Sequence, residues 1–172
     1  SMLVCNGEIY NHNKFRTGAE KSTSDCEILM PLIKDVGIMK AVDMINGDFA
    51  FVYTDGKQLL AARDPVGVRP LFYTRYAQGS IAFASEVKAL LFLNSDIHIF
   101  PPGHIYDSYI DGFVCYHTGY WGINKYLETD NSKEIRETFE QAVHERLATT
   151  DREIGFLLSG GLDSSLIVSI AA

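Results

Sequence analysis

Residues 157–165 read LLSGGLDSS and decide how the last part of the chain folds. The apolar residues 154–158 lead into this stretch and predict a short, buried parallel strand. Residues 162–171 follow it and predict a helix. A Ser-Gly-Gly turn between a strand and a helix places backbone N–H groups at the positive end of the helix dipole, where they can bind an anion. The sequence therefore predicts a phosphate-binding loop.

Glycines in such a loop let the backbone approach a phosphate closely, and serine hydroxyls add hydrogen-bond donors. The carboxylate of Asp163 would repel a bare phosphate, so we expect it to face N–H groups or a bound Mg²⁺. The alternative interpretation is an ordinary glycine turn. The full string after an apolar strand resembles the pyrophosphate-binding loop of the ATP pyrophosphatase group, whose enzymes adenylate a substrate and release pyrophosphate.

Composition narrows the class of protein. The chain has 172 residues, enough for one domain and part of another, and a formal net charge of −7 with no basic stretch argues against a nucleic-acid partner. No apolar run is long enough to span a bilayer, so we expect no membrane partner. The three cysteines are widely spaced and predict reduced thiols in the cytoplasm, and the five histidines lack metal-ligand spacing.

The N-terminal part contains two patterns with both a structural and a chemical interpretation. Residues 3–5 predict a short strand that ends at Asn6-Gly7, which is either a tight turn or a pair of donors to a developing oxyanion. Ser24 and Glu27 predict a capping box that begins a helix, which Pro31 should kink or delay. Asp25 in its first turn either complements the helix dipole or binds a substrate ammonium group.

The middle of the chain predicts antiparallel sheet. Residues 49–53 and 58–63 read as a hairpin around Asp55-Gly56, and residues 71–75 and 80–85 form another antiparallel pair. One more hairpin after residue 103 should turn at Asp111-Gly112, and short helices are expected at 38–45 and 86–91. Successive hairpins beside helices indicate an α+β fold.

The C-terminal part begins after a less patterned stretch that reads as a linker. Asn131 and Glu134 then predict a capped amphipathic helix. Its apolar face should comprise Ile135, Phe139, Ala142, Val143 and Leu147. This helix, the strand at 154–158 and the phosphate loop would open a second, parallel α/β domain.

Five motifs, in this order and spacing, resemble the glutaminase domain of class II glutamine amidotransferases. They are NGEIYN at 6–11, SDCE at 24–27, GDFAF at 47–51, RDPVGVRPL at 63–71 and SEVKAL at 85–90. With SGGLDS at 159–164, the chain resembles the glutamine-hydrolysing asparagine synthetases. The resemblance implies partial N-terminal-nucleophile-type antiparallel sheets with helices, followed by the start of a parallel α/β nucleotide-binding domain. Residues 1–118 would be a glutaminase domain lacking its N-terminal segment, 119–130 a linker, and 131–172 the first helix, strand and pyrophosphate loop of the synthetase domain.

The resemblance also implies a reaction in two halves. In the first, an N-terminal cysteine attacks the side-chain amide of glutamine, ammonia leaves, and water hydrolyses the thioester. Asn6 and Gly7 match the oxyanion hole, and Glu8 and Asp25 match positions that hold the α-ammonium of glutamine. In the second, aspartate and ATP with Mg²⁺ give β-aspartyl-AMP, and ammonia displaces AMP to give asparagine. The matching nucleotide contacts are Leu158, Ser159, Gly160, Gly161, Asp163 and Ser164, whereas Arg63 and Asp64 match a structural brace near the glutamine pocket.

The family begins with Met-Cys-Gly, and that segment lies upstream of Leu3. Ser1 is five residues before Asn6, about 16 Å along a strand, so it cannot replace the cysteine. Cys5 lacks a free amine and is expected to be a buried core thiol. We therefore expect the chain alone to be an inactive fragment. The alternatives are a non-catalytic paralogue or remnant that serves as a binding or assembly module, and a β-lactam-synthetase-like ligase. Exposed strand edges would favour a homo-oligomer.

Overall fold

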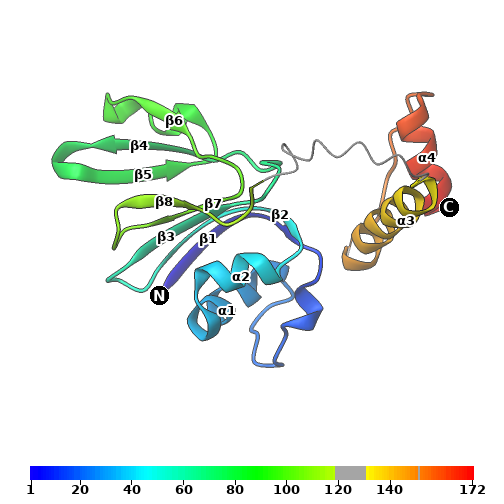
Figure 1. The fold of residues 1–172 in the computed structure, drawn as a ribbon, viewed down its shortest axis with the longest axis horizontal. Helices are drawn as coiled ribbons and strands as arrows, with labels where there is room; N and C mark the ends of the chain where they lie inside the picture. The colour runs from blue at the N-terminus through cyan, green and yellow to red at the C-terminus, as the bar shows by residue number, and fades with distance from the viewer. Residues whose placement is uncertain (119–130, 151) are drawn as a thin grey trace. The chain divides into compact units, whose positions relative to one another are not determined.

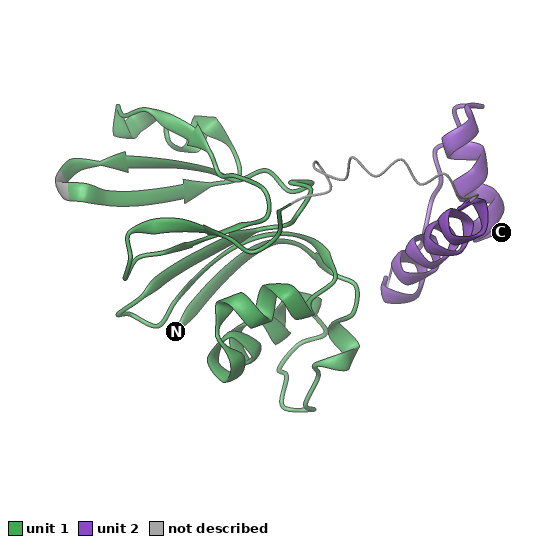
Figure 2. Ribbon diagram, viewed as in Figure 1, with its two compact units in different colours: residues 1–122 green, residues 123–172 purple. Residues whose placement is uncertain are grey.

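The computed structural model describes residues 1–118, 131–150 and 152–172. The chain divides into two compact units, Ser1–Gly122 and Ile123–Ala172, coloured separately in Figure 2. The linker predicted at 119–130 lies outside the described residues. None of the described helices has the length and apolar character needed to cross a bilayer.

The first unit contains two antiparallel sheets. The larger sheet has the order β1-β2-β3-β7-β8, with β1 at Met2–Ile9, β2 at Gly47–Thr54, β3 at Leu59–Arg63, β7 at His104–Asp107 and β8 at Gly112–Cys115. The smaller has the order β5-β4-β6, with β4 at Phe72–Tyr76, β5 at Ser80–Ala84 and β6 at Ile97–Ile99. The predicted α+β fold and its hairpins are confirmed.

Helices and the smaller sheet cover opposite faces of the larger sheet (Figure 1). Helices α1, Leu29–Val36, and α2, Ile38–Met44, share one core with alternate residues of β1 and β2, among them Ile9, Phe49 and Phe51. The intervening residues of the sheet form a second core with the smaller sheet, which includes Ala50 and Phe100. Because successive side chains of a strand point to opposite faces, one sheet can fill both cores.

Several short 3₁₀ helices connect these elements. They lie at His12–Lys14, Asp25–Ile28, Ala77–Gly79, Val87–Ala89 and Leu91–Leu93. The short helix expected at 86–91 is therefore two 3₁₀ turns. The helix predicted to begin near Ser24 starts as 3₁₀ and becomes α-helical only at Leu29, which places Pro31 in the first α-helical turn, where its missing N–H costs least.

The predicted capping box is wrong. The side chain of Ser24 makes no capping hydrogen bond. The carboxylate of Glu27 instead accepts hydrogen bonds from the backbone N–H groups of Lys21, at 2.7 Å, and Ser22, at 2.9 Å. Glu27 turns back to the preceding loop because that loop offers two N–H groups together, whereas a capping box offers it one.

The turn interpretation of Asn6-Gly7 is also wrong, because both residues lie inside β1. Gly7 is opposite Phe49 in the register with β2. A Cβ atom at Gly7 would lie 2.2 Å from the carbonyl oxygen of Asp48, far inside van der Waals contact. Glycine is therefore required here by the close approach of the two strands, and not by a reversal of the chain.

The second unit contains α3, Ser132–Thr149, and α4, Leu162–Ala171. The strand predicted at 154–158 is not formed, and Leu157 and Leu158 are 96% and 61% exposed. A strand needs a partner for its backbone groups, and none of the described residues in this unit supplies one. The start of a parallel sheet therefore stays a prediction.

Candidate functional site

The first group of predicted site residues lies on β1, which is an edge strand among the residues that the structure describes. Asn6 and Glu8 share one face of this strand, since side chains alternate. The amide nitrogen Nδ2 of Asn6 donates a hydrogen bond to Oγ of Ser85 at 3.3 Å. Ser85 directly follows β5, so the Asn6 side chain lies on the face of β1 that meets the smaller sheet.

The direction of the Gly7 N–H group follows from the pairing of its neighbour. The carbonyl oxygen of Phe49 accepts a hydrogen bond from the N–H of Asp64 at 2.8 Å, so the backbone groups of Phe49 point away from β1. In an antiparallel pair, the residue opposite must then point its own N–H and C=O away from β2. Gly7 is that residue, and its N–H is therefore directed to the outer edge of the sheet.

Glu8 faces a guanidinium group that sequence reasoning missed. Nη2 of Arg69 lies 3.8 Å from Oε1 of Glu8, and Nε of Arg69 is a buried nitrogen atom without a hydrogen-bond partner. Arg69 belongs to the RDPVGVRPL motif, but nothing within that motif indicates that this residue contacts Glu8. The pair is partly exposed and contributes little to stability by itself. The ion pair places the positive charge of Arg69 beside the Glu8 carboxylate, which is predicted to bind substrate.

Arg63 and Asp64 hold the loop that carries Arg69. The carboxylate of Asp64 is 1% exposed and accepts hydrogen bonds from four backbone N–H groups, those of Val66, Gly67, Val68 and Arg69, at 2.6–3.1 Å. The guanidinium of Arg63 donates to the carbonyl oxygens of Gly67, Arg69 and Phe100 at 2.7–2.8 Å. Burial lowers the pKa of Arg63, and the charge of Asp64 offsets part of that effect. The predicted structural brace is confirmed.

Asp25 approaches β1 at its outer edge. Its Oδ2 accepts a hydrogen bond from the N–H of Ile9 at 2.5 Å, so the carboxylate lies one residue beyond Glu8 along the strand. Asp25 begins the 3₁₀ turn as expected, and its predicted contact with an ammonium group stays a prediction. The four predicted residues therefore lie close together. Asn6, Gly7 and Glu8 belong to β1, and Asp25 contacts the outer edge of that strand.

Next to Asp25, the thiol of Cys26 has two acceptors within reach of its one proton, Sγ of Cys5 at 3.1 Å and the carbonyl oxygen of Gly7 at 3.6 Å. Cys5 was expected to be a buried core thiol, but it is only half-buried. It is separated from Cys26 by 21 positions. No local signal in the sequence pairs the two residues, because only the docking of the 3₁₀ turn on β1 brings them together.

The loop that was predicted to bind phosphate directly precedes α4 in the second unit. Gly160 has a φ of +81°, which favours glycine, and Gly161 is the N-cap residue of the helix. Oγ of Ser159 lies 3.0 Å from Oγ of Ser164 and accepts a hydrogen bond from the N–H of Gly161 at 3.4 Å. Two hydroxyl groups therefore meet above the N-terminus of α4, where the helix dipole favours an anion.

The donor set for Mg²⁺ is small. Asp163 is an exposed carboxylate in the first turn of α4. Within the described residues, no group of three or more His, Cys, Asp or Glu side chains could hold a metal ion. Since Mg²⁺ is commonly bound by one or two carboxylates together with substrate phosphates, Asp163 fits as a single protein ligand to an ion that arrives with a nucleotide.

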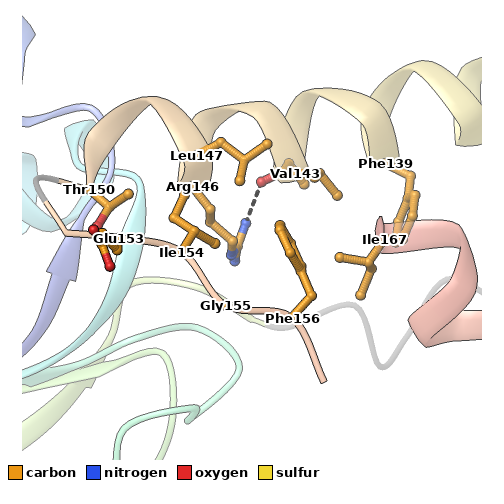
Figure 3. Close-up of a pocket in the computed structure, with 11 residues that line it drawn as sticks. Phe139, Val143, Arg146, Leu147, Thr150, Glu153, Ile154, Gly155, Phe156 and Ile167 are labelled. Carbon is orange, nitrogen blue, oxygen red and sulfur yellow. Dashed lines mark hydrogen bonds between the residues drawn. The ribbon is translucent and has the colours of Figure 1, made fainter. Parts of the chain in front are cut away.

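An apolar groove of about 630 Å³ lies beside α3 in the same unit. Figure 3 shows Phe156 of the extended segment turned toward α3, with Phe139 and Ile167 close by. Four of the five residues predicted for the apolar face of α3 line this groove, namely Phe139, Ala142, Val143 and Leu147, whereas Ile135 is 68% exposed. The apolar face of α3 and the segment that leads into the predicted phosphate loop therefore line the same groove.

Two protein-family models match the chain. Residues 1–114 match the glutamine amidotransferase domain, and residues 134–172 match asparagine synthase. Among curated proteins, a probable asparagine synthetase [glutamine-hydrolyzing] of Dictyostelium discoideum is 44% identical over 99% of this chain and 33% of its own length. The asparagine synthetase [glutamine-hydrolyzing] 3 of Arabidopsis thaliana is 43% identical over 98% of this chain and 30% of its own length. The chain thus spans about a third of the length of these relatives.

A solved structure with a similar fold is the glutamine phosphoribosylpyrophosphate amidotransferase from B. subtilis complexed with ADP and GMP. It aligns with 68% of this chain and 29% of its own, at a TM-score of 0.59 and 21% identity. A structure described as the allosteric regulatory enzyme of purine biosynthesis aligns with the same TM-score at 22% identity. At this identity the likeness concerns the fold, and it agrees with the α+β arrangement of the first unit.

Proposed function

Since the chain belongs to the glutamine amidotransferase domain family, we propose that it forms part of a glutamine-hydrolysing asparagine synthetase. One observation supports this proposal above the others. A single chain carries the glutaminase motifs on β1 and, after them, a Ser-Gly-Gly loop at the N-terminus of α4. The first would release ammonia from glutamine, and the second would bind ATP for the activation of aspartate. The free cysteines suit a reducing compartment, and we place the protein in the cytoplasm.

For the glutamine half-reaction, we assign the oxyanion to Nδ2 of Asn6 and the backbone N–H of Gly7. Each such donor is typically worth about 2.7–4 kcal/mol of barrier. Glu8 and Asp25 would hold the α-ammonium of glutamine, and Arg69, 3.8 Å from Glu8, would orient its carboxylate. Cys5 and Cys26 are not assigned as nucleophiles. Cys5 extends from the face of β1 opposite Asn6, and both cysteines pack against the core that β1 and β2 share with the helices. The nucleophile is assigned to the family's N-terminal cysteine.

For the ATP half-reaction, we assign the pyrophosphate to the N–H groups at Gly160 and Gly161 and to the hydroxyls of Ser159 and Ser164. The two hydroxyls are already side by side at 3.0 Å, so little reorganisation is needed to present both to one phosphate. Leu158, which directly precedes the loop, is assigned as a contact of the nucleotide. Asp163 would supply one ligand to Mg²⁺, which would neutralise phosphate charge and orient the leaving group.

The proposal is tested on the protein as its native source makes it, with aspartate, ATP and Mg²⁺ as substrates. Asparagine formation is measured with either glutamine or ammonium chloride as the nitrogen source. Asn6→Ala should reduce the glutamine-dependent rate about 100-fold and leave the ammonium-dependent rate unchanged, because only the first half-reaction needs the oxyanion donor. Ser159→Ala should reduce both rates to a similar extent.

Two matched variants serve as controls. Asn13→Ala removes an exposed asparagine close to β1, and Ser169→Ala removes an exposed serine from the far end of α4. Neither should change either rate. If the wild-type protein forms no asparagine from either nitrogen source, the proposed function is wrong. If Asn6→Ala lowers both rates equally, the assignment of Asn6 to glutamine hydrolysis is wrong.

A further inference from the structure

The two thiols beside β1 are closer than their positions in the sequence suggest. Sγ of Cys26 lies 3.1 Å from Sγ of Cys5, and both residues are half-buried. A disulfide bond needs about 2.05 Å between the sulfur atoms, so the two atoms are about 1 Å from bonding distance. The two residues belong to different elements, since Cys5 is on β1 and Cys26 is in the 3₁₀ turn Asp25–Ile28.

The thiol pair is reachable from solvent. A hollow of about 450 Å³ is lined by Cys5 and Cys26 together with Lys21, Glu27 and Met30. Lys21 and Glu27 place charged groups at this hollow, and the backbone N–H of Lys21 is bonded to the Glu27 carboxylate. A small polar oxidant could therefore enter the hollow and meet a sulfur atom.

We infer that Cys5 and Cys26 form a redox-sensitive site that closes to a disulfide when a small-molecule disulfide oxidises it. Cys5, as a thiolate, attacks one sulfur of the oxidant and releases its other half as a thiol. Cys26, once deprotonated, then attacks Sγ of Cys5 in the mixed disulfide and releases the second half. The two protons of the protein thiols end on the two released thiols, and the oxidant takes up two electrons.

The order of the two attacks follows from the hydrogen bond between the thiols. Cys26 is the donor and Cys5 the acceptor. This bond, together with burial, raises the pKa of Cys26, so Cys26 holds its proton until Cys5 has reacted. A metal ion is a poorer occupant, because within the described residues no third His, Cys, Asp or Glu completes a ligand set.

Closure would tie two parts of the predicted glutamine site together. Cys5 precedes Asn6, and Cys26 follows Asp25, whose carboxylate is bonded to the N–H of Ile9. The cross-link would span 21 positions and restrict the unfolded chain, which should raise the midpoint of thermal unfolding by about 10 °C. The inference rests on the two thiols alone and does not depend on the proposed function.

The experiment uses the purified 172-residue chain, reduced and then incubated with a series of ratios of oxidised to reduced glutathione. Free thiols are alkylated, and intact mass and peptide mapping count and locate them. We expect Cys5 and Cys26 to lose their reactive thiols without gaining the mass of glutathione, a linked peptide pair that contains both residues, and a higher midpoint of thermal unfolding than in the reduced chain. The exposed Cys115 should carry any glutathione adduct.

Variants separate this pair from the exposed Cys115. Cys115→Ser should form the internal disulfide as readily as the wild type does. Cys5→Ser and Cys26→Ser should each abolish it, and Cys26→Ser should leave a mixed disulfide with glutathione on Cys5, the thiol that attacks first. The inference is overturned if the wild type and Cys115→Ser keep both thiols alkylatable at every ratio, or if the mapped disulfide joins Cys115 to another residue. Because these readouts come from chains with an intact pair, misfolding of the other variants cannot decide the outcome.

Discussion

Replacing Asp64 with alanine should destabilise the first unit more than any exposed aspartate replacement. The carboxylate is 1% exposed and accepts four backbone N–H hydrogen bonds from the loop that follows it. Asp64→Ala leaves those donors without their acceptor and leaves the buried guanidinium of Arg63 without a neighbouring negative charge. Both consequences occur in the folded state only, so the loss appears in the free energy of unfolding.

The magnitude follows from these two terms. A hydrogen bond to a charged group contributes about 1.5–3 kcal/mol, but the four donors share one carboxylate and water can reach some of them after the substitution. Arg63 keeps its hydrogen bonds to three carbonyl oxygens and loses only the coulombic attraction of Asp64. This loss adds less than removing one partner of a buried ion pair typically costs, which is about 3–5 kcal/mol. We therefore expect a loss of about 4 kcal/mol for Asp64→Ala. Asp64→Asn keeps the shape and one acceptor oxygen but places an amide against the N–H of Arg69, so about 2–3 kcal/mol should be lost.

The assay is urea unfolding of the chain followed by far-ultraviolet circular dichroism. Asp55→Ala is the matched control, because its carboxylate also accepts two backbone N–H bonds, from Lys57 and Gln58 at 2.8 Å, but on an exposed turn. Water can replace that carboxylate, so a much smaller loss is expected. If Asp64→Ala costs no more than Asp55→Ala at an unchanged dependence on urea, the burial argument is refuted.

Two further predictions concern the backbone and the pH. Gly7→Ala should lower the free energy of unfolding by at least about 3 kcal/mol, because the new Cβ would lie 2.2 Å from the carbonyl oxygen of Asp48. Gly56→Ala meets no atom within 4 Å and should lower it by only about 1–2 kcal/mol, because of the positive φ at that position. Urea unfolding of both variants measures the difference. The pKa of Glu20 is lowered from 4.5 to about 2, chiefly by the N–H of Thr17, so the loop is stabilised above pH 4.5 and loses this stabilisation as the pH falls toward 2. Amide hydrogen exchange at Thr17 should show that loss in the wild type, and an equally steep loss in Glu20→Gln would contradict it.

The hairpins of the first unit could be predicted because their signals are local. Residues 49–53 and 58–63 alternate or run apolar around Asp55-Gly56, and the structure pairs β2 with β3 across that turn. The same applies to α1, which ends at Gly37 with a φ of +79° as the sequence indicates. In each case the residues that specify the element lie within it or beside it.

The site was only partly predictable, because its contacts join residues remote in sequence. The hydrogen bond from Asn6 to Ser85 joins residues that are 79 positions apart, and no sequence pattern near Asn6 predicts Ser85 as its partner. Arg69 reaches Glu8 from a loop whose backbone N–H groups are bonded to the Asp64 carboxylate. The prediction of a capping box was wrong for a related reason. The Glu27 carboxylate accepts hydrogen bonds from the N–H groups of Lys21 and Ser22, in a loop whose shape the local sequence pattern does not specify.

The outcomes at Gly7 and at residues 154–158 follow from one physical rule. The hydrogen bonds of a helix are internal, so α4 forms directly after Gly161. The hydrogen bonds of a strand belong to a second segment, so an apolar run predicts burial but does not by itself form a strand. The Asn6-Gly7 pair depends on a second segment in the same way. Here β2 pairs with β1 so closely that only glycine fits at position 7, and the chain continues as a strand. The predicted anion site depends on the loop and the helix, and both form without the strand, so its Ser159–Ser164 contact is set by local geometry alone.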